Sequence, residues 1–188
     1  MEDAGLLGCG ALSVLGVFLL ANTIYNYGKA IFTDAGTPPE YEKVVASELA
    51  DSESAIPLRQ CGKCNLVKPP RTHHCSVCGR CVMKMDHHCP WVNNCVGHKN
   101  YRYFCLFMLF LSLSCLFIIV VFGTWFSDIV LHFRRRSMTR EARQCIMTSF
   151  MICCSILVSL LVLGGFHVFL VLTNQSTIEF QVNMIRRR

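Results

Sequence analysis

Charge is scarce in this chain. Only 16% of its 188 residues are Asp, Glu, Lys or Arg, and 53% are apolar, whereas an ordinary soluble domain carries charge on about a quarter of its residues. The shortage excludes a simple soluble globular protein and points to long apolar segments. The net charge of +6 is spread over the polar segments, so by itself it does not indicate a nucleic-acid-binding protein.

The sequence also lacks the features of a signal peptide. The only charged residues before the first apolar run, residues 6–27, are Glu2 and Asp3, where a signal peptide would carry positive charge. No small-residue cleavage site follows the run. At about 1.5 Å per residue, this run can cross a bilayer core of roughly 30 Å. We therefore predict a membrane helix here.

Two further apolar runs, residues 103–126 and 146–172, are also long enough to span a bilayer. His167 lies in the last run, where an ionisable side chain is a candidate functional group; the alternative is a neutral imidazole bonded to a neighbouring helix. The predicted fold is membrane α-helical, with three transmembrane helices and a loop-rich cysteine-rich domain between the first and the second. The predicted division is 1–28, 103–126 and 145–172 for the membrane helices, 29–60 for a cytosolic linker, 61–102 for the cysteine-rich domain, 127–144 for a short loop and 173–188 for a cytosolic tail.

Residues 61–95 of the cysteine-rich domain hold seven of the thirteen cysteines and four histidines. So short a segment cannot bury enough apolar surface to fold alone, and Cys-x-x-Cys steps with interspersed histidines have the ligand spacing of tetrahedral Zn²⁺. Two closed sites need eight ligands, so three of the eleven are surplus, and spacing alone does not say which. The eleven are Cys61, Cys64, His73, His74, Cys75, Cys78, Cys81, His87, His88, Cys89 and Cys95. Disulfides are disfavoured by the two-residue spacing in a Lys/Arg-rich loop.

The distribution of Lys and Arg predicts the orientation in the membrane. Placing the linker, the cysteine-rich domain and the C-terminal tail in the cytosol puts thirteen of these residues inside and five outside, as the positive-inside rule requires. A reducing cytosol also suits thiolate ligands. The spacing Cys-x₂₋₄-Cys-x₁₂-His of nucleic-acid-binding zinc fingers is absent, so no nucleic-acid partner is expected.

Residues 61–100, with the string Asp86-His87-His88-Cys89-Pro90-Trp91-Val92-Asn93-Asn94-Cys95-Val96-Gly97, resemble the cysteine-rich domain of the DHHC-type protein S-acyltransferases (palmitoyltransferases). The resemblance implies two structural zinc ions. One would bind Cys61, Cys64, His74 and Cys81, and the other Cys75, Cys78, His88 and Cys95. It also implies that Cys89, which neither ion needs, accepts the acyl group from acyl-CoA, with His87 as the base and Asp86 orienting it.

Alternatives remain for two of these residues. Instead of a nucleophile, Cys89 would be the seventh cysteine ligand under a different assignment of ligands to the zinc ions, or a buried free thiol. His73 is more simply a solvent-facing imidazole, or one that supports a zinc ligand from outside the coordination sphere.

The resemblance extends beyond the cysteine-rich domain. Asp34-Ala35-Gly36 stands where the family has Asp-Pro-Gly, and Ser176-Thr177-Ile178-Glu179 where it has Thr-Thr-x-Glu. Thr177 would help hold Asp86, and Glu179 would brace the zinc domain; a plain helix N-cap explains the same residues. Trp91 and Asn100 would support the site, Trp91 beside the opening of a cavity for the acyl chain.

The function implied by the resemblance is transfer of a long-chain acyl group from acyl-CoA, through Cys89, to membrane-proximal cysteines of protein substrates. No Gly-rich phosphate loop is present, so basic side chains would hold the CoA phosphates. The candidates are Arg71, Lys84, Lys99 and Arg102. We expect an endomembrane protein, of the Golgi or endoplasmic reticulum. The helix matching the family's first and most of its cytosolic tail are missing, which suggests a truncated form and keeps open a membrane-anchored zinc adaptor without catalysis.

Overall fold

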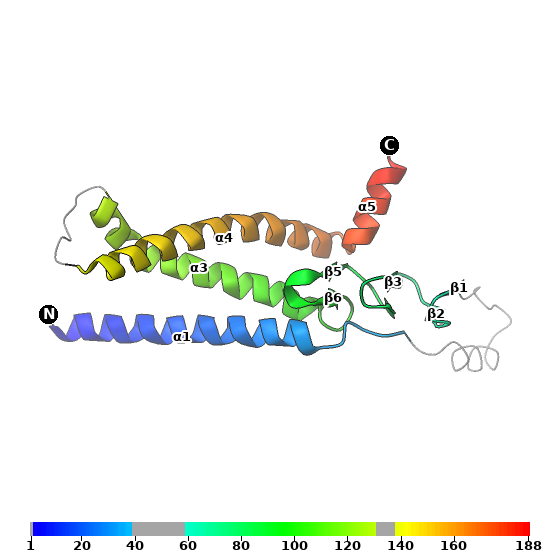
Figure 1. Cartoon of the computed structure of the whole chain (residues 1–188), viewed down its shortest axis with the longest axis horizontal. Coiled ribbons are helices and arrows are strands. Elements are labelled where there is room, and N and C mark those ends of the chain that lie inside the picture. The colour runs from blue at the N-terminus through cyan, green and yellow to red at the C-terminus, as the bar shows by residue number, and fades with distance from the viewer. Residues whose placement is uncertain (1, 39–58, 131–137) are drawn as a thin grey trace. The chain divides into compact units, whose positions relative to one another are not determined.

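The computed structural model describes residues 2–38, 59–130 and 138–188, with side chains from residue 10 onward, and is mostly helical (Figure 1). Its elements in chain order are α1 (Glu2–Phe32), β1 (Arg59–Gln60), β2 (Val67–Lys68), β3 (His73–Cys75), β4 (Arg80–Val82), β5 (His87–Cys89), η1 (Pro90–Val92), β6 (Asn94–Val96), α3 (Tyr101–Val130), α4 (Arg140–Leu172) and α5 (Thr177–Arg186). Most of the predicted linker 29–60, and part of the predicted short loop 127–144, lie outside the described residues.

Helices α1, α3 and α4 each contain a segment long and apolar enough to cross a membrane: Gly10–Phe32, Tyr101–Val130 and Arg140–Leu172. This confirms the predicted three-helix membrane fold with a cysteine-rich region between the first and second helices. The helices run past the apolar segments on which the prediction was based. Lys and Arg are good helix formers, so residues such as Lys29 and Arg140 continue the helical backbone where hydrophobicity ends.

The chain divides into two compact units. The first comprises Met1–Tyr25 and Cys105–His167, and the second Asn26–Phe104 and Val168–Arg188. In the first unit Thr23 Oγ1 lies 3.2 Å from Ser114 Oγ, a polar contact of the kind that joins membrane helices. Phe126 stacks on Phe150 with ring centroids 4.1 Å apart, which joins α3 to α4.

Much of the apolar surface of the three long helices is exposed, for example at Val17, Val120 and Val162. Contiguous exposed apolar surface on this scale is rare on soluble monomers. It is suited to contact with lipid.

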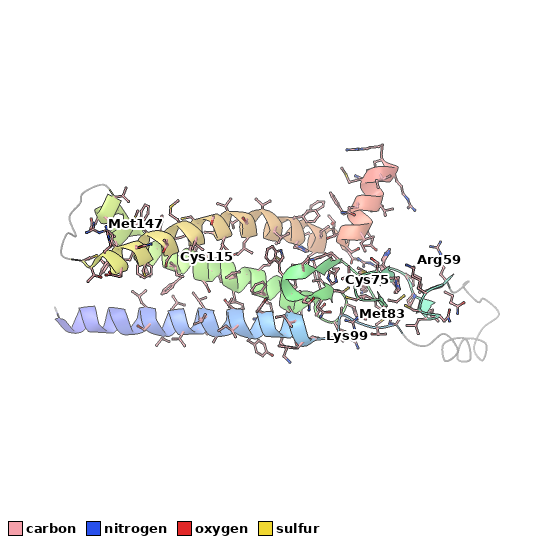
Figure 2. All side chains as sticks on the ribbon, in the orientation of Figure 1. Arg59, Cys75, Met83, Lys99, Cys115 and Met147 are labelled. Atoms are coloured by element: carbon pink, nitrogen blue, oxygen red, sulfur yellow. The ribbon has the colours of Figure 1, made fainter. Side chains whose placement is uncertain are left out.

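The second unit is built from three short antiparallel hairpins, β1–β2, β3–β4 and β5–β6. Its buried cluster is small and consists of Ala35, Cys75, Val82, Met85 and Cys95, with Cys78 and Ile178 packed against it; Cys75 is labelled in Figure 2. Two of these core side chains are thiols of the predicted zinc sites. Such a core supplies too little apolar burial to hold the hairpins without metal.

The end of α1 is fastened to the hairpins by Asn94. Its Nδ2 donates to the carbonyls of Ala30, Ile31 and Thr33 at 3.3, 3.1 and 2.9 Å. These are the carbonyls left without helical partners at a C-terminus. Arg80 completes the link by donating to Asn94 Oδ1 at 3.1 Å.

The segment after α1 folds over the hairpins in a tight turn. Asp34 Oδ1 accepts the N–H groups of Gly36 and Thr37 at 2.7 and 3.1 Å, and Asp34 Oδ2 pairs with Arg80. Ala35, which stands where the family has proline, is fully buried. The turn brings the end of the first predicted membrane helix onto the zinc domain.

Candidate active site

The first Cys/His cluster joins two hairpins. Cys61 and Cys64 lie in the β1–β2 turn, and His74 and Cys81 face each other across β3–β4. His74 Nδ1 lies 3.8, 3.1 and 3.9 Å from the sulfurs of Cys61, Cys64 and Cys81. All four ligand atoms lie within 4.8 Å of one another.

The second cluster repeats the arrangement one hairpin further on. Cys75 ends β3 and Cys78 lies in the β3–β4 turn, and His88 and Cys95 pair across β5–β6. His88 Nδ1 lies 3.8, 3.3 and 3.8 Å from the sulfurs of Cys75, Cys78 and Cys95. Hairpin β3–β4 therefore contributes to both clusters and couples the three hairpins.

Both clusters fit Zn²⁺. Their donor set is Cys₃His, a closed structural set, and Zn–S and Zn–N bonds of about 2.3 and 2.1 Å in a tetrahedron place neighbouring ligand atoms roughly 3.5–3.8 Å apart. The observed S···N separations bracket that range. These clusters contain the two ligand sets implied by the resemblance, and neither includes Cys89.

Cys89, His87 and Asp86 form a connected group beside the second cluster. His87 Nδ1 lies 2.7 Å from Asp86 Oδ2, and the His87 side chain also bonds the Cys89 thiol. The ring of Phe104 packs edge-on against His87 with centroids 5.3 Å apart. An imidazole between a carboxylate and a thiol is the arrangement that activates a cysteine nucleophile.

The three groups shift one another toward their charged forms. Burial opposes ionisation of Asp86, but hydrogen bonds from His87 and Thr177 outweigh it and lower the pKa of that carboxyl. Burial likewise disfavours charge on His87, yet Asp86 and Cys89 raise its pKa to about 9. For Cys89, burial is outweighed by His87 and by backbone N–H groups, and the pKa of the thiol falls. The geometry favours a thiolate–imidazolium pair.

Asp86 is held by a residue 91 positions away in the sequence. Thr177 donates its backbone N–H to Asp86 Oδ1 and its Oγ1–H to Asp86 Oδ2, both at 2.8 Å. Asp86 is almost fully buried, and its own N–H donates to Val96 O at 2.9 Å. Its carboxylate thus has partners on both oxygens, as a buried charge requires.

The same segment is also a helix N-terminus. Ser176 caps α5 by accepting the Glu179 N–H, and Glu179 reaches back to the Ser176 N–H at 2.7 Å, which together make a capping box. Glu179 pairs in addition with Arg71, whose Nε lies 2.7 Å from Oε1. The N-cap interpretation and the supporting role implied by the resemblance therefore describe the same residues.

The two other supporting residues occupy different settings. Asn100 is fully buried; its Oδ1 accepts from Gly97 N–H at 2.9 Å and its Nδ2 donates to Cys95 O at 2.8 Å. Trp91 follows Cys89 in η1, and its side chain is 85% exposed. Its carbonyl accepts from the Tyr27 hydroxyl at 3.0 Å.

A pocket of about 270 Å³ opens beside Asp86. Arg71, Lys84 and His98 give it basic groups, and Ser176 and Asn174 line another part of its wall. Two of the four basic residues proposed for CoA thus share this pocket, and the other two, Lys99 and Arg102, do not line it. Arg102 instead lies over the Tyr103 ring, 4.5 Å from its centroid.

The sequence also singled out two other histidines, His73 and His167. His73 is half-buried. Its pKa is lowered mainly by burial and to a smaller extent by the charge of Lys68. His167 is buried, with its ring edge-on to Phe166. The sequence interpretation missed Arg80 and Asn94, whose roles depend on contacts 46 and 64 positions away, and no local motif marks them.

Comparison with known proteins places this geometry in context. The family model described as "DHHC palmitoyltransferase" matches residues 55–184. Palmitoyltransferase ZDHHC15 of Xenopus laevis is 37% identical over 87% of this chain and 54% of its own length. The probable protein S-acyltransferase 16 of Arabidopsis thaliana is 37% identical over 84% and 56%, and palmitoyltransferase ZDHHC20 of Homo sapiens is 36% identical over 83% and 49%. The chain spans about half the length of these curated relatives.

Proposed function

Since this chain belongs to the DHHC palmitoyltransferase family, we propose that it is a protein-cysteine S-acyltransferase. It would move a long-chain acyl group from acyl-CoA, through a thioester on Cys89, to cysteines of membrane-associated proteins. The observation that carries the proposal is the contact of His87 with both Asp86 and Cys89, while both Cys₃His clusters are complete without Cys89.

The first half-reaction uses the thiolate–imidazolium pair. Cys89 Sγ attacks the thioester carbonyl of acyl-CoA, the bond from that carbon to the CoA sulfur breaks, and the CoA thiolate leaves with the proton held by His87. Asp86 keeps the His87 ring oriented through Nδ1, so the other ring nitrogen faces the exchange of protons. The product is acyl-Cys89 and free CoA.

The second half-reaction reverses the roles. A substrate cysteine gives its proton to His87 and attacks the acyl-Cys89 carbonyl, and the Cys89 thiolate leaves. The enzyme returns to its starting state, so acyl-CoA and a protein thiol yield CoA and an acylated protein. The two zinc ions, when bound, hold the three hairpins together, and the chain's own residues carry out every step.

Acyl-CoA binding is proposed to combine lipid burial with charge. Each buried CH₂ of the acyl chain contributes about 0.8 kcal/mol, so burial of the acyl chain dominates the affinity for acyl-CoA. Of the four basic residues proposed for the CoA phosphates, Lys84 is the strongest candidate because it lines the pocket beside Asp86. Arg71 lines it too, but its guanidinium already contacts Glu179 and Asn174.

The zinc domain is proposed to face the cytosol, in a Golgi or endoplasmic reticulum membrane. The Lys/Arg bias and the thiolate donor sets support that orientation. Residues 61–102 would form the catalytic domain, and residues 173–188 a tail that supports Asp86.

The test is to incubate the purified full chain with labelled acyl-CoA. We expect hydroxylamine-labile label on the wild type, none on Cys89→Ser, and at least about a hundredfold slower labelling of His87→Ala, the usual range for loss of a general acid–base. Equal labelling of all three proteins would refute the mechanism. A wild type that stays unlabelled while it retains two zinc ions would favour the zinc adaptor instead.

A further inference from the structure

The three hairpins of the zinc domain repeat at a spacing of 14 residues. Cys61, Cys75 and Cys89 begin the three turns. The strand registers coincide once 14 is added from one hairpin to the next. They are Arg59↔Lys68 and Gln60↔Val67, His73↔Val82 and His74↔Cys81, and His87↔Val96 and His88↔Cys95. The hairpin that carries the proposed nucleophile is therefore the third copy of a metal-binding unit.

The backbone of the turns repeats as well. Asn65, Gly79 and Asn93 occupy the same place in the three turns, and all have positive φ, 54°, 66° and 46°. Asn and Gly are the residues that adopt this left-handed conformation most readily. The third turn thus has the backbone of the two metal-binding turns.

The hydrogen bonds to the first sulfur of each turn also recur. Backbone N–H groups two and three residues further on donate to it. The donors are Lys63 and Cys64 for Cys61, Val77 and Cys78 for Cys75, and Trp91 and Val92 for Cys89. The Cys78 N–H lies 3.3 Å from the Cys75 sulfur. These donors stabilise a metal-bound thiolate in the first two turns, and the same pair is directed at Cys89 in the third.

One position breaks the repeat inside the turn. Cys64 and Cys78 supply the second thiol of the first two turns, and Val92 stands in its place, almost completely buried. In the first two units the other two ligands are a histidine and a cysteine of the following hairpin. The positions that correspond to them in the third unit are Arg102 and Leu109, in α3. A valine methyl cannot bind metal, so the third turn has a single sulfur.

We propose that hairpin β5–β6 is a zinc knuckle from which the second thiol has been removed, and that Val92 is the positioning residue that keeps Cys89 out of metal coordination. The turn would still hold the Cys89 sulfur with the N–H donors of a knuckle, while Val92 leaves that sulfur free to react. The proposal deepens the proposed function and rests on it only for the role of Cys89.

The test restores the missing thiol in the full-length chain. Val92→Cys is compared with Val92→Ser, which has the same shape as the cysteine variant without a soft ligand, and with the wild type. All three proteins are kept in a reductant that does not bind metal, so that no disulfide forms between Cys89 and the introduced thiol. Elemental analysis first verifies two zinc ions per chain. Alkylation of Cys89 is then followed by peptide mass spectrometry as free Zn²⁺ is raised.

The proposal predicts that Zn²⁺ protects Cys89 from alkylation in Val92→Cys at a concentration at least about tenfold lower than in the other two proteins, because a second thiolate binds the ion. Chelation should reverse this protection. Equal midpoints in Val92→Cys and Val92→Ser would overturn the proposal.

A second variant guards against misfolding. It exchanges the whole turn for that of the second hairpin, by Pro90→Ser, Trp91→Val, Val92→Cys and Asn93→Gly. If neither this variant nor Val92→Cys retains two zinc ions, the turns are not interchangeable and the proposal is wrong. Alkylation needs no acyl transfer, so the result is independent of whether the proposed function holds.

Discussion

Thr177 and Asp86 are joined by two hydrogen bonds of 2.8 Å, one from the backbone N–H and one from the hydroxyl of the threonine. The backbone bond places the first turn of α5 against the carboxylate. This position stabilises the carboxylate, because the free N–H groups and the dipole of a helix N-terminus favour an anion. The hydroxyl adds a bond that a substitution can remove by itself. This relationship connects α5 to the carboxylate of the proposed catalytic group.

The first prediction concerns that hydroxyl. Thr177→Val should slow labelling of Cys89 by about tenfold, since a hydrogen bond to a charged group is worth roughly 1.5 kcal/mol, and should leave the zinc content unchanged. Thr177→Ser keeps the hydroxyl and should stay close to the wild type. Single-turnover labelling with acyl-CoA measures both variants; a slow serine variant would show that the threonine methyl, not the hydroxyl, matters.

The second prediction separates two roles of Arg71. Its guanidinium contacts Glu179 Oε1 at 2.7 Å and Oε2 at 2.8 Å, and Asn174 Oδ1 and O at 3.1 Å. Lysine cannot reproduce this planar, multiple contact. Arg71→Lys should therefore lower kcat several-fold with little change in the KM for acyl-CoA. Lys84→Gln, which changes a pocket residue outside this network, should raise KM instead. A raised KM in Arg71→Lys with unchanged kcat would assign Arg71 to CoA binding.

The third prediction is a pH dependence. Burial opposes the charge of Glu179, but bonds from the Ser176 N–H and from Arg71 outweigh it and lower its pKa below the usual 4.5. Because the folded-state pKa is the lower one, the stabilisation is fully present above the ordinary glutamate range. It is lost as the pH falls through the folded-state pKa. The Tm of the wild type should exceed that of Glu179→Gln near neutral pH, and the gap should shrink as the pH falls below about 4.5.

Loss of zinc at acid pH affects both proteins of that comparison alike, since their ligands are identical. The difference between their Tm values therefore isolates Glu179. A gap that stays constant from neutral pH down to about pH 3 would contradict the assignment.

The fourth prediction uses the positive φ of Asn93, 46°. Asn93→Gly matches Gly79 in the second hairpin and should retain stability and labelling. Asn93→Val forces a β-branched residue into the left-handed region, at a cost of about 1–2 kcal/mol, and should lower the Tm and slow labelling. Thermal unfolding in the presence of saturating zinc measures both. Equal Tm values for the two variants would show that the turn conformation is not required.

Long apolar runs made the three membrane helices predictable, because length and hydropathy alone decide whether a segment can span a bilayer. Their ends were not predictable: α4 begins at Arg140, before the apolar run, and Thr139 Oγ1 accepts the Ala142 N–H there. Capping and helix-forming polar residues extend a helix without any hydropathic signal.

The zinc domain shows a similar division. Cys/His spacing predicted metal binding, but only the resemblance assigned each ligand. The 14-residue repeat that relates Asn65, Gly79 and Asn93 is present in the sequence. It could have identified Cys89 as the cysteine whose turn lacks the second thiol ligand. The pairing of Arg71 with Glu179, 108 positions apart, has no such signal, because tertiary folding alone brings them together.

The central claim is that Cys89 carries the acyl group while both zinc ions stay bound. Peptide mass spectrometry of the full chain after brief exposure to palmitoyl-CoA tests it directly, with zinc measured on the same sample. We predict a palmitoyl thioester on the peptide containing Cys89, removed by hydroxylamine, at two zinc ions per chain. A palmitoyl group found only on another cysteine, with Cys89 unmodified, would contradict the account.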